Sequence, residues 1–253
     1  MYSALETLYE KYKIYELKPG AQTDALGDVY EELVRQAFLK QEVVDKFNHC
    51  IAPLTIEEEI VHAVCTDHEI EFIESVELLG VPKTDAGGEP KTDVCVLING
   101  NTYIKLTIKQ SRAAQVTVAE FSVDSIKNKV GIKDPKIISL MEKHQRDASA
   151  KNFSPEEREC LTKGMLEHRR ALVRWTYSGS TEDSEDLRVA NYSINFLIDG
   201  PTKELINFVT HSIDSLVNKT LQLSRGFGTG LSWTYATGTK GKKIQFKGST
   251  FTL

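Results

Sequence analysis

The fold of this 253-residue chain is decided by residues 90–109, which read PKTDVCVLINGNTYIKLTIK. An apolar run, Val94–Ile98, is followed by Asn99-Gly100, the strongest short-range signal for a β-hairpin. Residues 102–109 then alternate polar and apolar side chains, as a strand does when its two faces differ. We therefore predict two antiparallel strands joined by a tight turn.

This hairpin would bring side chains with useful chemistry together. Asp93 precedes the first strand, and Thr107 and Lys109 lie two residues apart on the second, so they share a face. Phosphodiester hydrolysis needs a cation that neutralises developing charge and lowers the pKa of a water molecule, and carboxylates suit Mg²⁺. Such spacing also occurs without function, with Asp93 as a turn residue and Lys109 as a solvated strand residue.

The amino-terminal third has helical periodicity. Apolar residues recur at helical spacing from Leu26 to Ala37, with Asp24 as the expected cap. Thr55 and Glu58 form a capping-box pattern that predicts a helix to about His68. Residues 69–79 look like a strand.

The remainder alternates helical and strand patterns. We predict a single α/β (α+β) domain over residues 1–253, with residues 226–253 as an added two-stranded ribbon. The other expected elements are strands at 116–121, 189–198, 232–237 and 243–246, helices at 122–129, 135–149, 154–177 and 203–218, and a turn at 199–201.

Composition sets broad limits. The chain is 40% hydrophobic and 26% charged, which is ordinary for a globular protein, and no apolar run approaches the ~20 residues of a membrane span. The first residues resemble no signal peptide. The four cysteines form no Cys-x-x-Cys pair, so we expect buried free thiols and no zinc site.

The charge is unevenly distributed. The net charge is −5, yet residues 215–253 contain no acidic residue and six basic ones. A second acid-free window, residues 94–119, holds Lys105, Lys109 and Arg112. A phosphate backbone responds to such local patches, although a solvated basic face would have the same composition.

The spacing of Asp93, Thr107 and Lys109 resembles the PD-(D/E)XK nuclease core. In ordered blocks through most of its length, the chain also resembles the MspI family of type II restriction endonucleases. The blocks are Leu26-Gly27, Tyr30-Glu31, Gly87-Gly88, residues 90–93, Ile108-Lys109, Ser111, Ala119-Glu120, residues 143–145, Asp147, residues 149–151, Phe153, residues 227–231, residues 233–236 and residues 245–248.

The resemblance implies a restriction-endonuclease-like core, a central mixed sheet flanked by helices, with the catalytic aspartate at Asp93 and the catalytic lysine at Lys109. Glu31 matches the position where many such nucleases supply a second acid for the metal, although it could equally be a solvated helix carboxylate. Thr107 departs from the pattern, because the superfamily carries Asp or Glu there and the MspI type carries Asn. A threonine hydroxyl is a shorter and weaker ligand.

The resemblance also implies the DNA contacts. The base contacts fall on Thr234, Thr237, Gln245 and Lys247, where a two-stranded ribbon would enter the major groove. Lys240, Lys242 and Lys243 would neutralise phosphates, and Ser111 and Arg112 could contact the backbone near the scissile phosphate. For His144, on an expected helix beside Lys143 and Gln145, we favour a structural role, with a phosphate contact as the alternative.

In activity, the resemblance implies a monomeric enzyme of the bacterial cytoplasm that cuts double-stranded DNA at CCGG with Mg²⁺. Its partners would be DNA and a cognate DNA methyltransferase acting on the same site, with no membrane. Two alternatives remain: a sequence-specific DNA-binding protein with impaired catalysis, suggested by Thr107, and a repair nuclease of the same superfamily with little sequence preference.

Overall fold

The computed structural model describes residues 3–85 and 87–251, which form two compact units. Unit 1 comprises the described residues up to Arg112 together with Asp186–Ser212, and unit 2 comprises Ala113–Glu185 and the described residues from Ile213 onward. The prediction of one domain over residues 1–253, with 226–253 as a recognition segment, stays a prediction. No helix in the described ranges is long and apolar enough to cross a bilayer.

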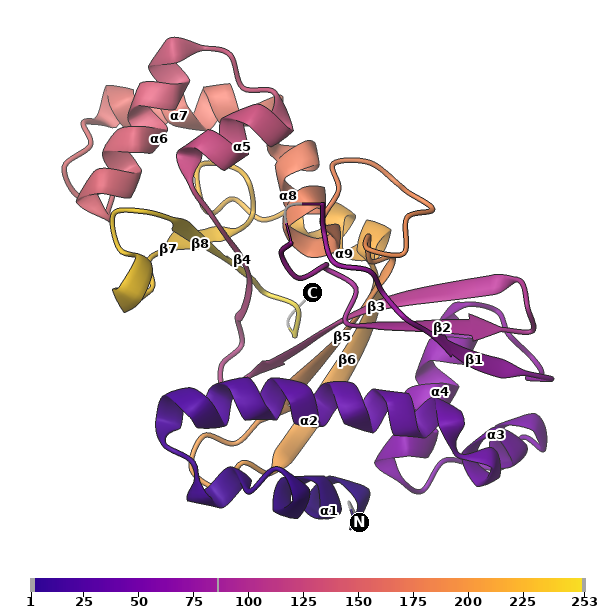
Figure 1. Ribbon diagram of the computed structural model, residues 1–253. Helices are drawn as coiled ribbons and strands as arrows, with labels where there is room; N and C mark the ends of the chain where they lie inside the picture. The colour runs from indigo at the N-terminus through magenta and orange to yellow at the C-terminus, as the bar shows by residue number, and fades with distance from the viewer. Residues whose placement is uncertain (1–2, 86, 252–253) are drawn as a thin grey trace. The chain divides into compact units, whose positions relative to one another are not determined.

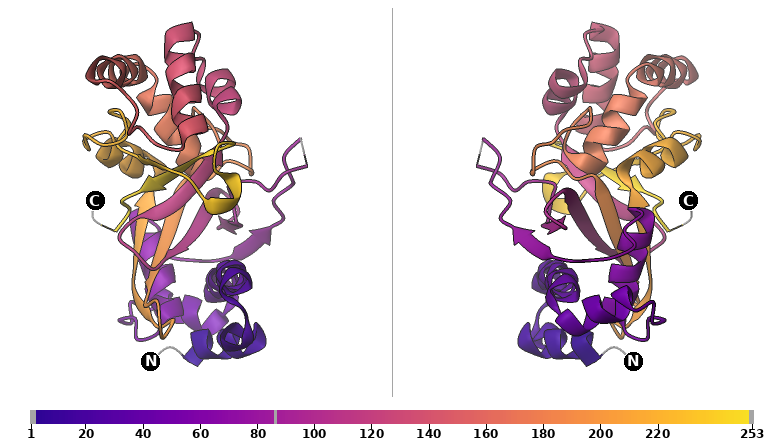
Figure 2. Two further views of the ribbon diagram at one scale, coloured as in Figure 1. Left: turned by 90° about the vertical axis from the view of Figure 1, so that its left-hand side faces the viewer. Right: turned by 90° about the vertical axis from the view of Figure 1, so that its right-hand side faces the viewer.

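Unit 1 is a five-stranded mixed sheet with helices on it. The strand order is β1-β2-β3-β5-β6; β3 and β5 are parallel and the other neighbours antiparallel. The strands are β1 (Val76–Leu79), β2 (Val94–Ile98), β3 (Thr102–Ser111), β5 (Tyr192–Ile198) and β6 (Leu205–Ser212), and the helices are α1 (Ser3–Lys11), η1 (Ile14–Glu16), α2 (Pro19–Leu39), α3 (Gln41–Asn48) and α4 (Ile56–Asp67). Figures 1 and 2 show the indigo and purple helices gathered together beside this sheet.

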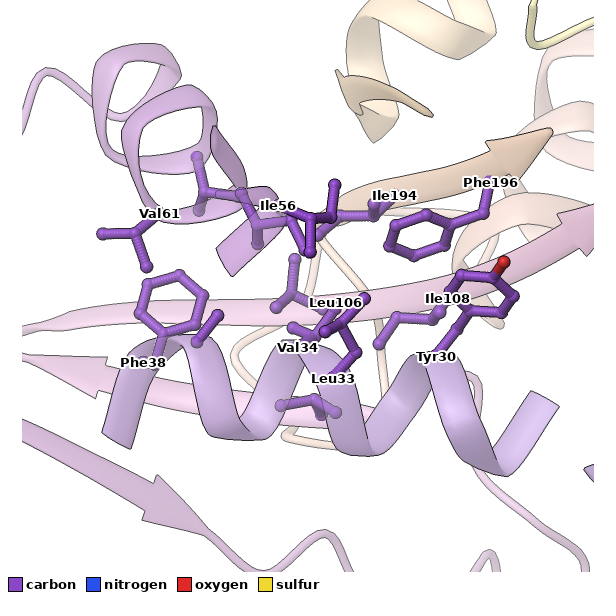
Figure 3. Packing of buried hydrophobic residues seen from close by; sticks show 14 of the residues in the cluster. Tyr30, Leu33, Val34, Phe38, Ile56, Val61, Leu106, Ile108, Ile194 and Phe196 are labelled. Carbon is purple, nitrogen blue, oxygen red and sulfur yellow. The ribbon is translucent and has the colours of Figure 1, made fainter. Parts of the chain in front are cut away.

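The core of unit 1 lies between α2, α4 and the central strands. Tyr30 of α2 points toward Phe196 of β5, and Phe38 of α2 points toward Val61 of α4 (Figure 3); all four side chains are at most 1% exposed. The Tyr30 and Phe196 rings stack with centroids 4.4 Å apart. Each such side chain contributes about 1.5–3 kcal/mol by leaving water, so this packing holds α2 on the sheet.

The hairpin and the capping box form as predicted. Asn99 and Gly100 have φ values of 53° and 67°, as a type I′ turn requires, and the Asn99 side chain accepts from the amide of Glu74. Thr55 Oγ1 accepts from the Glu58 amide, and the Glu58 carboxylate accepts from the Thr55 amide. These signals are local, which is why the sequence predicts them.

Unit 2 is a three-stranded antiparallel sheet, in the order β4-β8-β7, with its helices packed to one side of it (Figures 1 and 2). Its core includes Phe246, Leu231 and Trp175. The elements are β4 (Val116–Phe121), α5 (Val123–Val130), α6 (Pro135–Asp147), α7 (Pro155–Leu166), α8 (Arg169–Ser178), α9 (Ile213–Thr220), β7 (Ser232–Thr234), η2 (Thr237–Thr239) and β8 (Ile244–Gly248).

Two predicted helices are wrong in extent. Residues 203–218 are not one helix: Leu205–Ser212 is strand β6, because it pairs with β5, and only Ile213–Thr220 is helical. Residues 154–177 are two helices, because the His168 amide bonds to Met165 O, three residues back, and ends the regular ladder.

Four smaller predictions also fail. The α2 helix begins at Pro19, so Asp24 lies inside it and caps nothing. Of residues 69–79 only Val76–Leu79 is strand, since β2 offers only a short partner. The carboxy-terminal ribbon is part of a larger sheet, with β8 between β7 and β4. All four cysteines are free, but only Cys65 and Cys95 are buried; Cys50 is exposed and Cys160 is half-buried.

Candidate active site and recognition face

The β2–β3 hairpin places Asp93 beside Thr107 and Lys109. The Asp93 amide donates to Leu106 O at 2.8 Å, which extends the β2–β3 ladder by one residue beyond the Val94–Leu106 pair. Asp93 therefore stands opposite the end of β3 that carries Thr107 and Lys109. The three predicted catalytic residues converge because of this register.

One oxygen of the Asp93 carboxylate accepts three hydrogen bonds. Asp93 Oδ2 accepts from the Ile108 amide at 2.6 Å, from Lys109 Nζ at 2.9 Å and from Thr107 Oγ1 at 3.3 Å. Lys109 Nζ also donates to Ile108 O at 2.7 Å. The Asp93 and Lys109 side chains are 17% and 26% exposed, so the ion pair is partly shielded but reachable from solvent.

Glu31 reaches the same place from α2. It lines a pocket of about 480 Å³ together with Asp28, Arg35 and Asp93. Burial raises the pKa of Glu31, and the charge of Asp93 raises it further, while Arg35 and Lys109 oppose the shift. The two carboxylates therefore repel one another, which is the condition that a bound cation relieves.

Arg35 and Lys91 belong to this site, although neither was predicted from the sequence. Arg35 Nη2 donates to Glu31 Oε2 at 3.1 Å and to Asp93 O at 3.0 Å. Glu31 and Arg35 are four residues apart on a predicted helix, a spacing from which the sequence could have predicted their ion pair. Burial lowers the pKa of Lys91 to about 7; the charge of Lys109 lowers it and that of Asp93 raises it. No sequence signal reveals that burial.

The other predicted DNA contacts fall into two groups. Ser111 ends β3 on the face of Lys109, and Arg112 follows it in unit 1, exposed, with Nη2 3.5 Å from Gln22 Oε1. The predicted DNA-contacting residues of the carboxy-terminal segment all lie in unit 2, on β7, on β8 and on the connection between these strands. They are Thr234, Thr237, Lys240, Lys242, Lys243, Gln245 and Lys247.

The outer face of the unit 2 sheet is polar. Ile244 and Phe246 of β8 are fully buried, whereas the intervening Gln245 and Lys247 are half-buried and face outward. Thr237, Lys240, Lys242 and Lys243 are exposed. We call the outward side chains of β4, β7 and β8 the recognition face.

His144 is a core residue of unit 2. It is 3% exposed, and the rings of Phe153, Phe227 and Trp233 meet it edge-on. Burial lowers the pKa of His144 to about 4, with Arg158 lowering it and Asp147 raising it. The neutral ring shares a short hydrogen bond with Tyr235, which favours the structural role over a phosphate contact.

The mixed sheet flanked by helices is the core expected of the restriction-endonuclease fold, and known proteins bear this out. The family model for restriction endonuclease MspI matches residues 20–248. The type II restriction enzyme MspI of a Moraxella species is 33% identical over 96% of this chain and 98% of its own. This chain therefore belongs to the MspI restriction endonuclease family.

A solved structure and a second relative agree. A crystal structure of restriction endonuclease MspI in complex with its cognate DNA superposes with a TM-score of 0.84 and 31% identity, covering 97% of this chain and 99% of that one. The type II restriction enzyme BsuFI of Bacillus subtilis is 25% identical over 66% of this chain and 42% of its own.

Proposed function

We propose that this protein is a type II restriction endonuclease that makes double-strand cuts in DNA at CCGG by metal-assisted phosphodiester hydrolysis. The observation that carries the proposal is the convergence of Lys109 Nζ and the Ile108 amide on Asp93 Oδ2, at 2.9 and 2.6 Å, in a chain of the MspI family. A carboxylate and an ammonium group so close can act on the same phosphate.

The donor set suits Mg²⁺. Within the described ranges no three His, Cys, Asp or Glu side chains gather as a metal cluster, so the protein would offer only one or two carboxylates, Asp93 and Glu31. Mg²⁺ is commonly held in this way, with waters and substrate phosphate filling its other positions. When bound it would supply positive charge to the phosphate and lower the pKa of a water molecule.

Each side chain has a part in this proposal. Lys109 would orient the attacking water and stabilise charge on the phosphorus oxygens, while the Ile108 amide holds Asp93 in place. Arg35 would fix Glu31 by the bond at 3.1 Å. Thr107, 3% exposed, would keep the Asp93 carboxylate aligned through its hydroxyl.

The recognition face supports the DNA specificity. Hydroxyl, amide and ammonium groups of Thr234, Thr237, Gln245 and Lys247 are of the kinds that bind base edges in the major groove. Lys240 and Lys243 are exposed and would contact phosphates, as would Ser111 and Arg112 from unit 1. We further propose that one copy of the chain acts on its site, which a cognate DNA methyltransferase protects.

Digestion of a sequenced plasmid with purified protein and Mg²⁺, followed by sequencing of the fragment ends, tests the proposal. Cuts at CCGG are expected. Cuts at another short palindrome would keep the chemistry and reassign the base contacts. Absence of cutting in Mg²⁺ and Mn²⁺, with binding to CCGG duplexes retained, would instead identify a DNA-binding protein with impaired catalysis. The threonine at position 107, where the family pattern has another residue, would then explain the loss of activity.

A further inference from the structure

Glu120 lies in one row with two of the proposed base-contacting residues. In the unit 2 sheet Gln245 of β8 stands directly opposite Glu120 of β4 on one side and Thr234 of β7 on the other. Residues directly opposite one another in adjacent strands share a face, so all three side chains lie on the recognition face. Glu120 belongs to one of the sequence blocks that resemble the MspI family, but the sequence assigns it no role.

Hydrogen bonds fix the orientation of the Gln245 amide. Its Nε2 donates to Glu120 Oε1 at 2.6 Å, and its Oε1 accepts from Thr234 Oγ1 at 3.1 Å. An ionised carboxylate only accepts, so the amide nitrogen must face Glu120 and the amide oxygen must face Thr234. The opposite orientation would set two acceptors against each other.

The carboxylate of Glu120 is itself aligned by neutral donors. Thr239 Oγ1 donates to Glu120 Oε2 at 3.2 Å, while Gln245 occupies Oε1. The strands β7 and β8 belong to the acid-free segment, residues 215–253, so β4 brings this negative charge to the face. A carboxylate repels phosphate, and its place here is explained if it accepts a hydrogen bond from a base.

The order of donors and acceptors in the row matches a G·C pair. In the major groove guanine presents two acceptors, N7 and O6, and cytosine presents the N4 amino donor, whereas thymine presents an acceptor and a methyl group. Gln245 supplies a donor through its second Nε2 hydrogen, and Glu120 supplies an acceptor, whereas the single proton of the Thr234 hydroxyl is used on Gln245. An A·T pair would place an acceptor against the carboxylate.

We propose that Glu120 determines specificity in the DNA site: its carboxylate accepts from the N4 amino group of a cytosine and holds Gln245 with its N–H toward guanine. The inference rests on the proposed function, since it needs this face to contact DNA bases. It extends that function by assigning selection of cytosine over thymine to a residue outside the carboxy-terminal segment.

Equilibrium binding in Ca²⁺ tests the assignment. The duplexes carry CCGG, the same site with one cytosine replaced by thymine in a T·A pair, or N4-methylcytosine at either position. The proteins are the wild type, Glu120→Gln, which keeps the size of the side chain, and Glu142→Gln, which removes an equal charge from an exposed position of α6.

The wild type should bind one of the N4-methylcytosine duplexes and the matching thymine duplex about 5- to 150-fold more weakly than CCGG, the value of one good base contact. Glu120→Gln should lose most of this discrimination, because an amide can present either a donor or an acceptor. Glu142→Gln should keep the wild-type ratios, whatever its lower charge does to overall affinity.

Two results would overturn the inference while leaving the proposed function standing. One is a Glu120→Gln protein with undiminished discrimination against N4-methylcytosine and thymine. The other is a wild type that prefers CCGG over unrelated DNA but ignores N4-methylation at both cytosines. A wild type that binds every duplex equally would instead overturn the proposed function and the inference together.

Discussion

Lys109 Nζ lies 2.9 Å from Asp93 Oδ2; Lys109 is on strand β3, and Asp93 directly precedes its hairpin partner β2. The same oxygen accepts the Ile108 amide, so the carboxylate is held by the backbone as well as by the lysine. Because this backbone bond does not depend on Lys109, a substitution of the lysine leaves Asp93 in place. The catalytic contribution of each side chain can thus be measured separately from the fold.

We expect Asp93→Ala or Lys109→Ala to lower the single-turnover cleavage rate by at least about 10²–10³-fold, since each removes an electrostatic group beside the reacting phosphate. Binding to the cognate duplex in Ca²⁺ should stay near the wild-type value. Lys83→Ala, at an exposed lysine of the same unit whose side chain is 69% exposed, is the matched control. A normal cleavage rate in either active-site variant would place the active site elsewhere.

Thr107 is the departure from the family pattern, and its hydroxyl donates to Asp93 Oδ2 at a long 3.3 Å. Thr107→Asn, which restores the residue of the MspI type, should keep or raise the cleavage rate, because an amide oxygen is a better ligand than a hydroxyl. Thr107→Val keeps the shape without the hydroxyl and serves as the comparison. A large loss in the asparagine variant would mean that the threonine is tuned to this site.

Base contacts and phosphate contacts on the recognition face should separate by their salt and sequence dependence. Gln245→Ala or Lys247→Ala should cost about 1–3 kcal/mol on cognate DNA and much less on unrelated DNA. Lys240→Ala or Lys243→Ala should weaken both alike, and each should reduce the slope of log K against log salt by about 0.9, the value for one neutralised phosphate. Equal losses on both DNAs for Gln245→Ala would assign that residue to the phosphates.

The burial of neutral His144 predicts acid sensitivity of unit 2. Its folded pKa of about 4 lies below the unfolded value, so stability is fully present above pH ~6.5 and falls as the pH drops toward 4. Between pH 7 and pH 5 this residue should cost roughly 2 kcal/mol of unfolding free energy. Urea unfolding at both pH values measures the loss.

His144→Gln, which has no titrating ring, isolates this contribution from the carboxylates. The variant loses the hydrogen bond between the imidazole and Tyr235 and should be less stable at pH 7 than the wild type. Between pH 7 and pH 5, the variant should lose less unfolding free energy than the wild type, by the roughly 2 kcal/mol assigned to His144. A pH dependence equal to that of the wild type would show that the histidine does not stay neutral.

What the sequence predicts well depends on contacts a few residues apart. Asn99-Gly100 sets the hairpin through two positive φ values, and the hairpin then sets the register of Asp93 against Thr107 and Lys109. Thr55 and Glu58 satisfy each other's amides within one helical turn. These hydrogen bonds join residues a few positions apart, so residue type and spacing suffice to predict them.

What only the tertiary structure decides involves partners far apart in the chain. Residues 205–212 have helical spacing but become β6, because pairing with β5 offers more backbone hydrogen bonds than an isolated helical turn. The place of Glu120 beside Gln245 depends on the pairing of β4 with β8, more than a hundred residues away in sequence. The sequence by itself determined the hairpin and the three residues that it brings together, Asp93, Thr107 and Lys109, whereas the three-stranded sheet and its carboxylate depend on strand pairing that no local pattern encodes.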